Sequence, residues 1–375
     1  MKEIKEILER VSAFADGEKA ILATVVDVRG SGYRLPGARM LMLENGDTFG
    51  MVSGGCLEAD VLERAKKVLK TGRAEVFTYD TTNDENSVFS LNMGCRGVIR
   101  ILLEPVGKDD LLLESLSEIG VSRRRQVIAT LISADSAIDV QIGGRVFCQD
   151  SDSFKFDGVP PALHDHAEII DECRSFFLSG DHYGFRTFEL PEGSFEFAFE
   201  SIEPPLSLLL FGAGADAVPL VRIVSELGWQ VTVFDHRPAY LTSERFPAAT
   251  SLIARGIDES SYPFASDART AAVMMTHNYE RDSEILPALL KSDVFYIGAL
   301  GPKRRTEQLL GELAAGGENF TEGQLEKLYA PAGLDIGADT PEAISLSIIA
   351  EIQSVMKTRG AGHLRDRKGS IYDRK

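Results

Sequence analysis

The spacing of apolar residues along the first hundred positions predicts a mixed α/β domain. Over residues 2–16 apolar side chains recur at intervals of three and four, which is the pattern of a surface helix. Residues 20–26 then form an unbroken apolar run rich in β-branched side chains, which predicts a strand buried on both faces. The other elements predicted here are a strand at 38–43, a turn at Asn45-Gly46, a helix that follows Cys56 and runs through Val68, and a strand at 98–103.

Residues 106–200 carry weaker patterns, and we interpret them as a middle α/β segment that completes the N-terminal domain. A strand is predicted over 126–133, and its segment Ile128–Ile132 is similar to Leu22–Val26. The similarity is compatible with a related βαβ arrangement and, over so few residues, equally with chance. Phe195–Phe199 alternates aromatic and other residues with a period of two, as an amphipathic strand does.

Pro204-Pro205 marks the predicted domain boundary, because consecutive prolines disfavour a helix before them and stiffen a linker. Beyond this point apolar strands alternate with helical segments, which argues for a doubly wound parallel sheet. The last helix is expected to begin with Asp339 or Thr340 as its cap and Pro341 in its first turn. The predicted strands of this region are 207–211, 230–234, 271–276 and 294–298.

These patterns divide the chain into an N-terminal α/β domain and a C-terminal α/β domain. A length of 375 residues agrees with two domains, since single cores seldom grow beyond about 250–300 residues. The predicted parts are residues 1–105 and 106–200 for the N-terminal domain, 201–360 for the C-terminal domain, and 361–375 for a flexible polar tail.

Composition narrows the classes of partner and compartment. Lys and Arg total 40 and Asp and Glu total 57, which gives a formal net charge of −17. An acidic chain repels phosphate backbones and anionic lipids, so nucleic acid and membrane are poor partners. No apolar run approaches the ~20 residues of a membrane span, and the N-terminus lacks the apolar stretch of a signal peptide. The four cysteines are scattered without a CxxC pair, so we expect a reduced, cytoplasmic protein.

The first strand of the C-terminal region runs into Gly212-x-Gly214-x-x-Ala217, which predicts a Rossmann-like fold. Gly212 permits a tight turn, and Gly214 lets the backbone approach a pyrophosphate. Asp235, about 20 residues further on, is placed to bond a ribose hydroxyl. Asp216 inside the glycine turn would repel a pyrophosphate, so bound NAD or NADP is a weaker expectation than the fold.

Other polar residues follow later strands of the same region. His277 comes after the third strand, where open α/β sheets bind their ligands, although a structural histidine is an alternative. A second glycine turn at Gly301 opens a helix whose first turn holds the cations Lys303, Arg304 and Arg305. Cations there oppose the helix dipole, so they indicate either an expected anion or a solvated face. The sequence shows no Tyr-x-x-x-Lys pair for hydride transfer, which weighs against a simple dehydrogenase.

In the N-terminal domain, Ser53-Gly54-Gly55-Cys56 places a thiol at the predicted start of a helix. A helix N-terminus carries partial positive charge, which favours the nucleophilic and metal-binding thiolate. The flanking glycines leave room for a ligand, whereas a small buried packing residue is the alternative for Cys56. Cys95 has a similar glycine setting. Cys148 and Cys173 do not, and we expect both to be packing residues.

A second loop, Arg29–Ala38, contains glycines and arginines that are suited to phosphate. Backbone N–H groups and guanidinium groups of such a loop can hold an anion. An anionic ligand needs a local positive pocket in a protein this acidic, and Arg29, Arg34 and Arg39 are the candidates for it.

The glycine loops and the polar strand ends belong to long, ordered motifs at both ends of the chain. These motifs are Gly30-Ser31-x-Tyr33-Arg34-x-Pro36-Gly37-Ala38, Ser53-Gly54-Gly55-Cys56-x-Glu58, Phe211-Gly212-Ala213-Gly214, Asp235-His236-Arg237-Pro238, Thr276-His277-Asn278-Tyr279-x-x-Asp282, Tyr296-Ile297-Gly298-Ala299-Leu300-Gly301 and Ala330-Pro331-x-Gly333-Leu334-Asp335-Ile336-Gly337. Together they resemble the XdhC and CoxI family, the xanthine dehydrogenase accessory factors. The resemblance leaves the middle of the chain unaligned.

The resemblance implies a role in the maturation of a molybdenum enzyme. Members of this family bind the molybdenum cofactor (molybdopterin), support its sulfuration with a cysteine desulfurase, and deliver it to molybdenum hydroxylases. Cys56 is the residue that carries over with most weight, and we add Arg34 and Ser53 as candidate phosphate or pterin contacts. Arg96 stands where the family often has a glycine after the second cysteine, which puts a ligand role for Cys95 in doubt.

The sequence therefore leaves three functions open. The leading hypothesis is a molybdenum cofactor chaperone for a xanthine dehydrogenase-like hydroxylase, with a cysteine desulfurase as a further partner and a homodimer as an option. The alternatives are an NAD(P)-dependent oxidoreductase that uses the Rossmann-like domain alone and a noncatalytic scaffold for the hydroxylase. The predicted cofactor-binding residues are Arg34, Ser53, Gly54, Gly55, Cys56, Gly212, Gly214, Asp235, His277 and Gly301.

Overall fold

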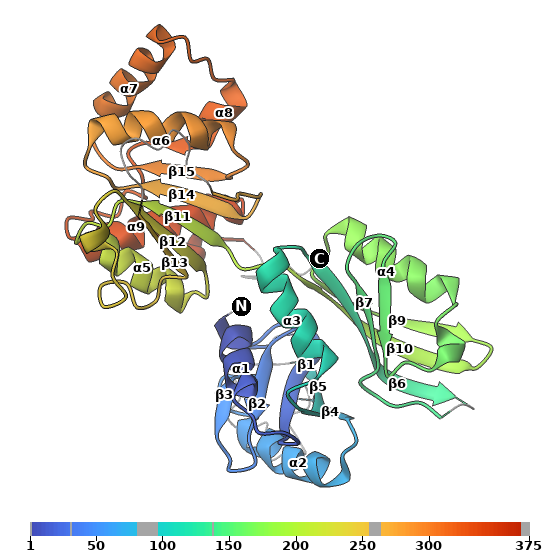
Figure 1. Ribbon diagram of the computed structural model, residues 1–375. Helices are drawn as coiled ribbons and strands as arrows, with labels where there is room; N and C mark the ends of the chain where they lie inside the picture. Colours follow the sequence, from blue (N-terminus) through green and yellow to red (C-terminus); the bar gives the residue numbers. More distant parts are fainter. Residues whose placement is uncertain (1, 31, 81–96, 137–138, 255–263, 369–375) are drawn as a thin grey trace. The chain divides into compact units, whose positions relative to one another are not determined.

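The chain divides into two compact units, Glu3–Pro204 and, for its main part, Pro205–Lys375. Figure 1 shows the helices and strands of both units. The computed structural model describes residues 2–30, 32–80, 97–136, 139–254 and 264–368.

The first unit contains two five-stranded antiparallel sheets, each covered by a helix that follows its third strand in the chain. The strand orders are β3-β2-β1-β5-β4 and β8-β7-β6-β10-β9. Helix α2 contacts β1 and β5, and helix α4 contacts β6, β7 and β10. The elements are α1 (Lys2–Ser12), β1 (Ala20–Gly30), β2 (Arg39–Met42), β3 (Thr48–Gly50), α2 (Glu58–Thr71), β4 (Glu75–Asp80), β5 (Gly97–Val106), α3 (Leu111–Ser122), β6 (Gln126–Ser136), β7 (Arg145–Cys148), β8 (Phe154–Asp157), η2 (Pro161–Leu163), α4 (Ala167–Ser179), β9 (Tyr183–Leu190) and β10 (Gly193–Ile202).

The two sheets are structural repeats of each other. The similar segments Leu22–Val26 and Ile128–Ile132 lie at the same place, in the central strands β1 and β6. The pairing of β1 with β5 skips Val26, and the pairing of β6 with β10 skips Ile132, so even the bulge recurs. The similarity therefore reflects a repeated fold. The βαβ arrangement was the wrong expectation, because the strands of both sheets pair antiparallel.

Two ion pairs join the repeats reciprocally. Arg39 at the start of β2 donates from Nη1 to Glu200 Oε1 on β10 at 2.9 Å, and Arg145 at the start of β7 donates to Glu104 on β5. Each arginine also donates at 3.0 Å to the carbonyl oxygen of the glycine two residues before it. Arg39 is 3% exposed and Arg145 is 5% exposed. Buried charges are tolerated when they are paired in this way, and both pairs span the contact between the repeats.

Apolar packing completes the contact between the repeats and fills each of them. One small cluster combines Val26 and Leu102 of the first repeat with Ile132 and Ala198 of the second. Strand β1 is buried from Ala20 to Asp27, as its apolar run predicts. Cys148 and Cys173 are fully buried in the core of the second repeat, which confirms them as packing residues.

The second unit is built on a parallel six-stranded sheet in the order β13-β12-β11-β14-β15-β16, which is the strand order of the Rossmann fold. Helices α5 and α9 pack on one face and α6 and α7 on the other, each with its own apolar cluster (Figure 1). The elements are β11 (Ser207–Phe211), α5 (Ala217–Glu226), β12 (Gln230–Asp235), η3 (Pro238–Tyr240), β13 (Ser251–Ala254), β14 (Thr270–Met274), α6 (Tyr279–Lys291), β15 (Tyr296–Ala299), α7 (Lys303–Ala315), α8 (Glu322–Glu326), β16 (Leu328–Tyr329), α9 (Pro341–Met356) and η4 (Leu364–Asp366).

The sequence patterns of the second unit agree with the structure for its central strands. The predicted α/β class with a C-terminal Rossmann-like sheet is confirmed, and all four predicted strands are present. The edge strands β13 and β16 were not predicted. Thr340 caps α9 by accepting a hydrogen bond from the Ala343 N–H at 3.2 Å, and Pro341 begins the helix. Residues 369–375 of the predicted tail lie outside the described residues.

Candidate functional site

The Cys56 loop, residues Met51–Leu57, connects β3 to α2, and Ser53 holds it together. Ser53 is buried, its N–H donates to Glu58 Oε1 at 2.8 Å, and its hydroxyl donates to the other oxygen of the same carboxylate. Ser53 Oγ in turn accepts hydrogen bonds from the N–H groups of Gly55 at 3.2 Å and Leu57 at 3.1 Å. These bonds satisfy backbone donors ahead of the helix, as an N-terminal cap does. The buried Ser53 thus holds the backbone of the loop in place through its hydrogen bonds.

The thiol of Cys56 lies on the exposed side of this loop. Gly54, Gly55 and Cys56 are all exposed, and Cys56 Sγ lies 3.6 Å from Ser53 Oγ. Gly55 has a φ of 101°, and a Cβ atom built on it would meet nothing within 4 Å. The ring of Tyr33 lies against Gly54, where a Cβ would come within 3.3 Å. Open space around a glycine and an accessible thiol are the features that a bound ligand requires.

The helix begins slightly later than the sequence pattern predicts. Helix α2 starts at Glu58, with Leu57 in the cap position, so Cys56 stands one residue before the cap. Leu57 is fully buried beneath the loop, whereas its neighbour Cys56 is exposed. The buried leucine anchors the loop and leaves the thiol outside.

The arginines predicted to form a positive pocket each face a carboxylate instead. Arg29 Nε lies 2.9 Å from Asp27 Oδ2, and Arg34 forms an ion pair with Glu3. Arg39 is buried between the two repeats. The three guanidinium groups therefore do not form a set of free cations, and a cofactor contact by Arg34 stays a prediction. Ser31, Cys95 and Arg96 lie outside the described residues.

In the second unit, internal packing limits the space at both glycines of the fingerprint. Gly212 directly follows β11 with a φ of 116°, and a Cβ atom there would lie 2.3 Å from the carbonyl oxygen of Met275. A Cβ atom on Gly214 would lie 2.3 Å from Asp216 Oδ1. Gly212 therefore demands glycine before any ligand is considered, because the clash is with backbone, whereas at Gly214 the Asp216 side chain would have to move.

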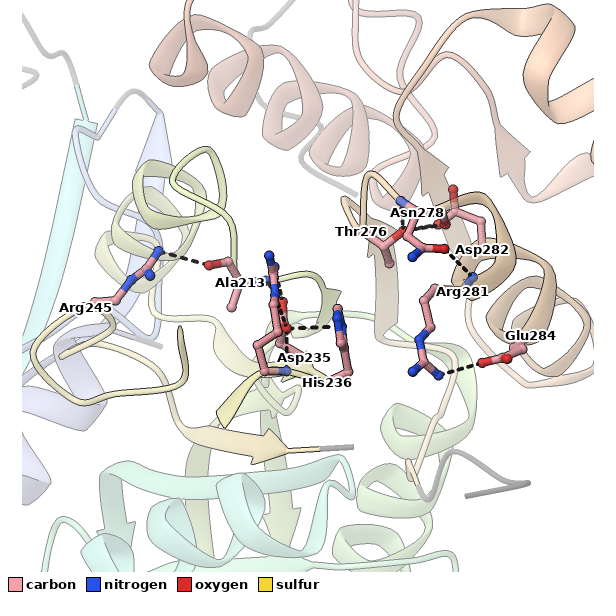
Figure 2. A network of polar contacts seen from close by, with 10 residues as sticks. Ala213, Asp235, His236, Arg245, Thr276, Asn278, Arg281, Asp282 and Glu284 are labelled. Atoms are coloured by element: carbon pink, nitrogen blue, oxygen red, sulfur yellow. Dashed lines mark hydrogen bonds and ion pairs between the residues drawn. The ribbon is translucent and has the colours of Figure 1, made fainter. Parts of the chain in front are cut away.

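Asp235, at the end of β12, is fully engaged within the protein (Figure 2). Its Oδ2 accepts from the Ala213 N–H at 2.7 Å and from Arg237 Nη2 at 2.9 Å. Its Oδ1 accepts from the backbone N–H of Arg237 at 2.8 Å and from Nε at 2.9 Å. Burial raises the pKa of Asp235, but these hydrogen bonds outweigh burial and hold it at about 2. The predicted ribose contact by Asp235 stays untested, and the carboxylate already has four donors.

His277 pairs with the acidic residue of the glycine turn. Its Nε2 lies 2.7 Å from Asp216 Oδ2. His277 lies in the turn after β14 and has a φ of 54°, an uncommon conformation for a residue other than glycine. The pair occupies the start of α5, where the fingerprint would place a pyrophosphate.

The Gly301 turn is tied to the turn after β14 through a carboxylate. Gly301 has a φ of 119° and leads into α7. Arg305 in the first turn of α7 donates to Asp282 Oδ2 at 2.7 Å. Thr276 donates to Asp282 Oδ1 at 2.5 Å (Figure 2). Lys303 and Arg304 are exposed. Of the three cations predicted to face an anion, Arg305 is therefore paired with a carboxylate of the protein itself.

Arg281 is a candidate site residue that the sequence patterns did not reveal. It lies in the first turn of α6, and its side chain is 8% exposed. Four and eight residues later stand the buried Ile285 and Leu289, so Arg281 falls on the apolar stripe of its helix. A cation on the buried stripe of a helix is the signal that would have identified it.

The described part of the chain lacks two further features, a cluster of metal ligands and a membrane-spanning helix. Within residues 2–30, 32–80, 97–136, 139–254 and 264–368, no cluster of three or more His, Cys, Asp or Glu residues is arranged to hold a metal ion. Over the same residues, no helix has the length and apolar character to cross a membrane.

Comparisons with known families match both units. The family pattern described as the XdhC Rossmann domain matches residues 208–352, and that of the XdhC and CoxI family matches residues 13–80. The first match includes the glycine turn, Asp235, His277 and Gly301. The second includes the whole Cys56 loop.

Individual relatives match over nearly the whole chain. A Bacillus subtilis protein, named as a probable subunit of xanthine dehydrogenase, is 31% identical over 351 residues, which cover 91% of this chain and 94% of that protein. The Escherichia coli molybdenum cofactor insertion chaperone PaoD is 25% identical over 349 residues, covering 92% of this chain and 86% of PaoD. A crystal structure described as a xanthine dehydrogenase from Bacillus halodurans superimposes with a TM-score of 0.73 and 29% identity, covering 96% of this chain and 97% of the other.

Proposed function

Because this chain belongs to the XdhC and CoxI family, we propose that it is a maturation factor that binds the molybdenum cofactor and delivers it to a xanthine dehydrogenase-like hydroxylase. The cofactor is cargo in this role. The names of two relatives that match over most of the chain support it, since one is a cofactor insertion chaperone and the other is named as part of a xanthine dehydrogenase.

The exposed thiol of Cys56 is the observation that carries the proposal. A thiolate is the nucleophilic and metal-binding form of cysteine. The open space at Gly55 gives cargo access to this sulfur, and the Ser53–Glu58 bonds keep the loop in shape without using the thiol. Residues of the chain thus hold and present a sulfur atom, and the cofactor supplies the redox chemistry of the client enzyme.

Finer parts of the proposal concern sulfuration, assembly and compartment. We expect the factor to support sulfuration of its cargo together with a cysteine desulfurase, and to work in the cytoplasm. A homodimer is a further option. An exposed cysteine on a glycine loop suits a hand-over between proteins, since both cargo and partner can reach the sulfur.

An NAD(P)-dependent oxidoreductase is the alternative, and the strand order of the second unit favours it. Two observations weigh against it. Asp235 already accepts four hydrogen bonds, and the Asp216–His277 pair lies where a pyrophosphate would bind. Steady reduction of NAD at about one turnover per second or faster would favour this alternative over the chaperone. A noncatalytic scaffold for the hydroxylase would leave Cys56 without a role.

The proposal is tested by co-expressing a client hydroxylase with the Cys56→Ser factor. We expect client activity and client molybdenum content to fall to nearly the level found without the factor. Cys173→Ala is the control, because it removes a thiol from the interior of the same unit. This control variant should activate the client like the wild type.

Circular dichroism and thermal unfolding of each variant separate loss of function from loss of fold. Cys56 is exposed, so its replacement by serine should leave the unfolding temperature unchanged. Full activation of the client by the Cys56→Ser variant would show that this thiol is not needed and would remove the main support for the proposal.

A further inference from the structure

A small cavity lies at the carboxyl edge of the parallel sheet, and Gly212 of the glycine fingerprint is part of its lining. Its apolar wall comes from Phe211, Phe234 and Ile285, and its polar wall includes Thr276 and Arg281. Its volume of about 20 Å³ is enough for one oxygen-sized group. Open α/β sheets bind their ligands at this edge.

Arg281 brings an unpartnered donor to this cavity. Its Nη1 donates to Glu284 Oε2 at 2.9 Å, whereas its buried Nη2 has no hydrogen-bond partner among the described residues. A buried cationic donor without an acceptor is costly, because desolvation is not compensated. Figure 2 shows the guanidinium between Glu284 and the Asp235–His236 turn.

Two other polar side chains of the cavity, those of Asp235 and Thr276, are already hydrogen-bonded, and His236 Nδ1 lies 3.4 Å from Asp235 Oδ1. Asp235 accepts hydrogen bonds with both carboxylate oxygens, mainly from Arg237, which also balances its charge. The Thr276 hydroxyl donates to Asp282, and Asp282 is paired with Arg305. The buried donor that lacks an acceptor is therefore the positively charged Nη2 of Arg281.

Glu284 leaves Arg281 available for a second negative group. Glu284 is the carboxylate paired with Arg281 among the described residues, and its side chain is 45% exposed. A half-exposed partner neutralises a buried charge less completely than a buried one, because water screens it. An oxyanion that placed one oxygen in the cavity would accept a hydrogen bond from Nη2, while Nη1 keeps its bond to Glu284.

We propose that this cavity is an oxyanion subsite, in which Arg281 Nη2 binds one oxygen of a phosphate or carboxylate group of a small ligand. The rest of that ligand lies outside, along the carboxyl edge of the sheet. The subsite is distinct from the position at the start of α5 where the fingerprint would place a pyrophosphate, because Asp216 and His277 hold that position. It is also independent of Cys56, which lies in the other unit.

The test is titration of the full chain with inorganic phosphate and, separately, with acetate, at constant ionic strength and followed by calorimetry and thermal unfolding. We expect Arg281→Gln to raise the dissociation constant about tenfold or more, since a charge-assisted hydrogen bond is lost. We expect Glu284→Gln to lower it severalfold, because a competing negative charge is removed.

Two control variants isolate the subsite. Arg245→Gln removes a cation from the same unit that donates to the Ala213 carbonyl oxygen, and it should bind the anion like the wild type. Cys56→Ser should also bind it normally, so a failure of the subsite is distinguishable from a failure of the maturation role.

The outcomes show which oxyanion the subsite binds and whether the subsite exists. Phosphate binding that depends on Arg281 identifies a phosphate ester, and acetate binding with the same dependence identifies a carboxylate. If the Arg281→Gln protein does not fold, the proposal is judged by whether Glu284→Gln changes the affinity for the anion. Binding of neither anion, or binding that is unaffected by both substitutions, would overturn the proposal.

Discussion

The two repeats of the first unit share one architecture but differ in the loop that follows their third strand. In the first repeat this loop is Ser53-Gly54-Gly55-Cys56 and ends at the buried Leu57. In the second repeat the equivalent segment is Val159-Pro160-Pro161-Ala162 and ends at the buried Leu163. The two leucines stand as far apart in the chain as the equivalent residues Arg39 and Arg145.

The difference separates what the fold requires from what function requires. Both repeats keep the buried leucine, so this anchor belongs to the fold. The second repeat builds the connection with two prolines and a short 3-10 helix, Pro161–Leu163, and has no thiol there. Because the same scaffold closes with Pro160 and Pro161 in place of Gly54 and Gly55, and without a cysteine, packing does not explain the exposed Cys56.

Thiol labelling gives the largest expected contrast between the repeats. At pH 8, native Cys56 should react with iodoacetamide at least about 100-fold faster than Cys148 or Cys173. Burial raises the pKa of Cys148 to about 11 and that of Cys173 to about 12, so both stay protonated as well as inaccessible. Peptide mass mapping reads each site separately. Similar rates at all three would contradict the contrast.

Breaking either of the two reciprocal ion pairs should lower stability by a similar amount if the two repeats are equivalent. Arg39→Met and Arg145→Met each leave a carboxylate without its partner between the repeats. We expect each to lower the free energy of unfolding by about 3–5 kcal/mol. Urea unfolding followed by circular dichroism measures the loss.

The double variant Arg145→Met/Glu104→Met provides the control for this prediction. Replacing both members of a buried pair by apolar residues is often close to neutral, so most of the stability should return. A large loss for one single variant and none for the other would show that the two contacts are not equivalent.

Gly55→Ala should affect stability less than either arginine substitution. Its φ of 101° disfavours a side chain, while the space around it is open, so the cost should be about 1–2 kcal/mol. Gly120→Ala, within helix α3, is the opposite control and should stabilise by about 0.5–1 kcal/mol. Thermal unfolding compares the two. A stabilised Gly55→Ala protein would mean that the loop does not require this conformation.

The elements that could be predicted are those whose buried residues form a continuous apolar run in the sequence. Strand β11 is an unbroken apolar run, and its predicted bounds match the structure. Strands β8 and β9 were missed because their residues are largely half-buried or exposed, so neither alternation nor a continuous run marks them. The two repeats of the first unit resemble each other in sequence over only five residues, because they share the pairing of their strands rather than the identity of their side chains.

The candidate site shows the same limit. Cys56 was identified because flanking glycines are a local signal. The partners of Asp235 lie two residues away and at the glycine turn, so its engagement depends on how the backbone turns after β12. Burial of Arg281 is a tertiary property, and only its place on the apolar stripe of α6 is visible in the sequence.

Cofactor content of the anaerobically purified protein tests the central claim most directly. Wild-type and Cys56→Ser proteins, produced in cells that make molybdopterin, are compared for bound pterin and molybdenum per chain. The maturation role predicts bound cofactor on the wild type and at least about a tenfold loss on Cys56→Ser, with the same unfolding temperature for both. Equal cofactor content on the two proteins would contradict the role assigned to the Cys56 loop.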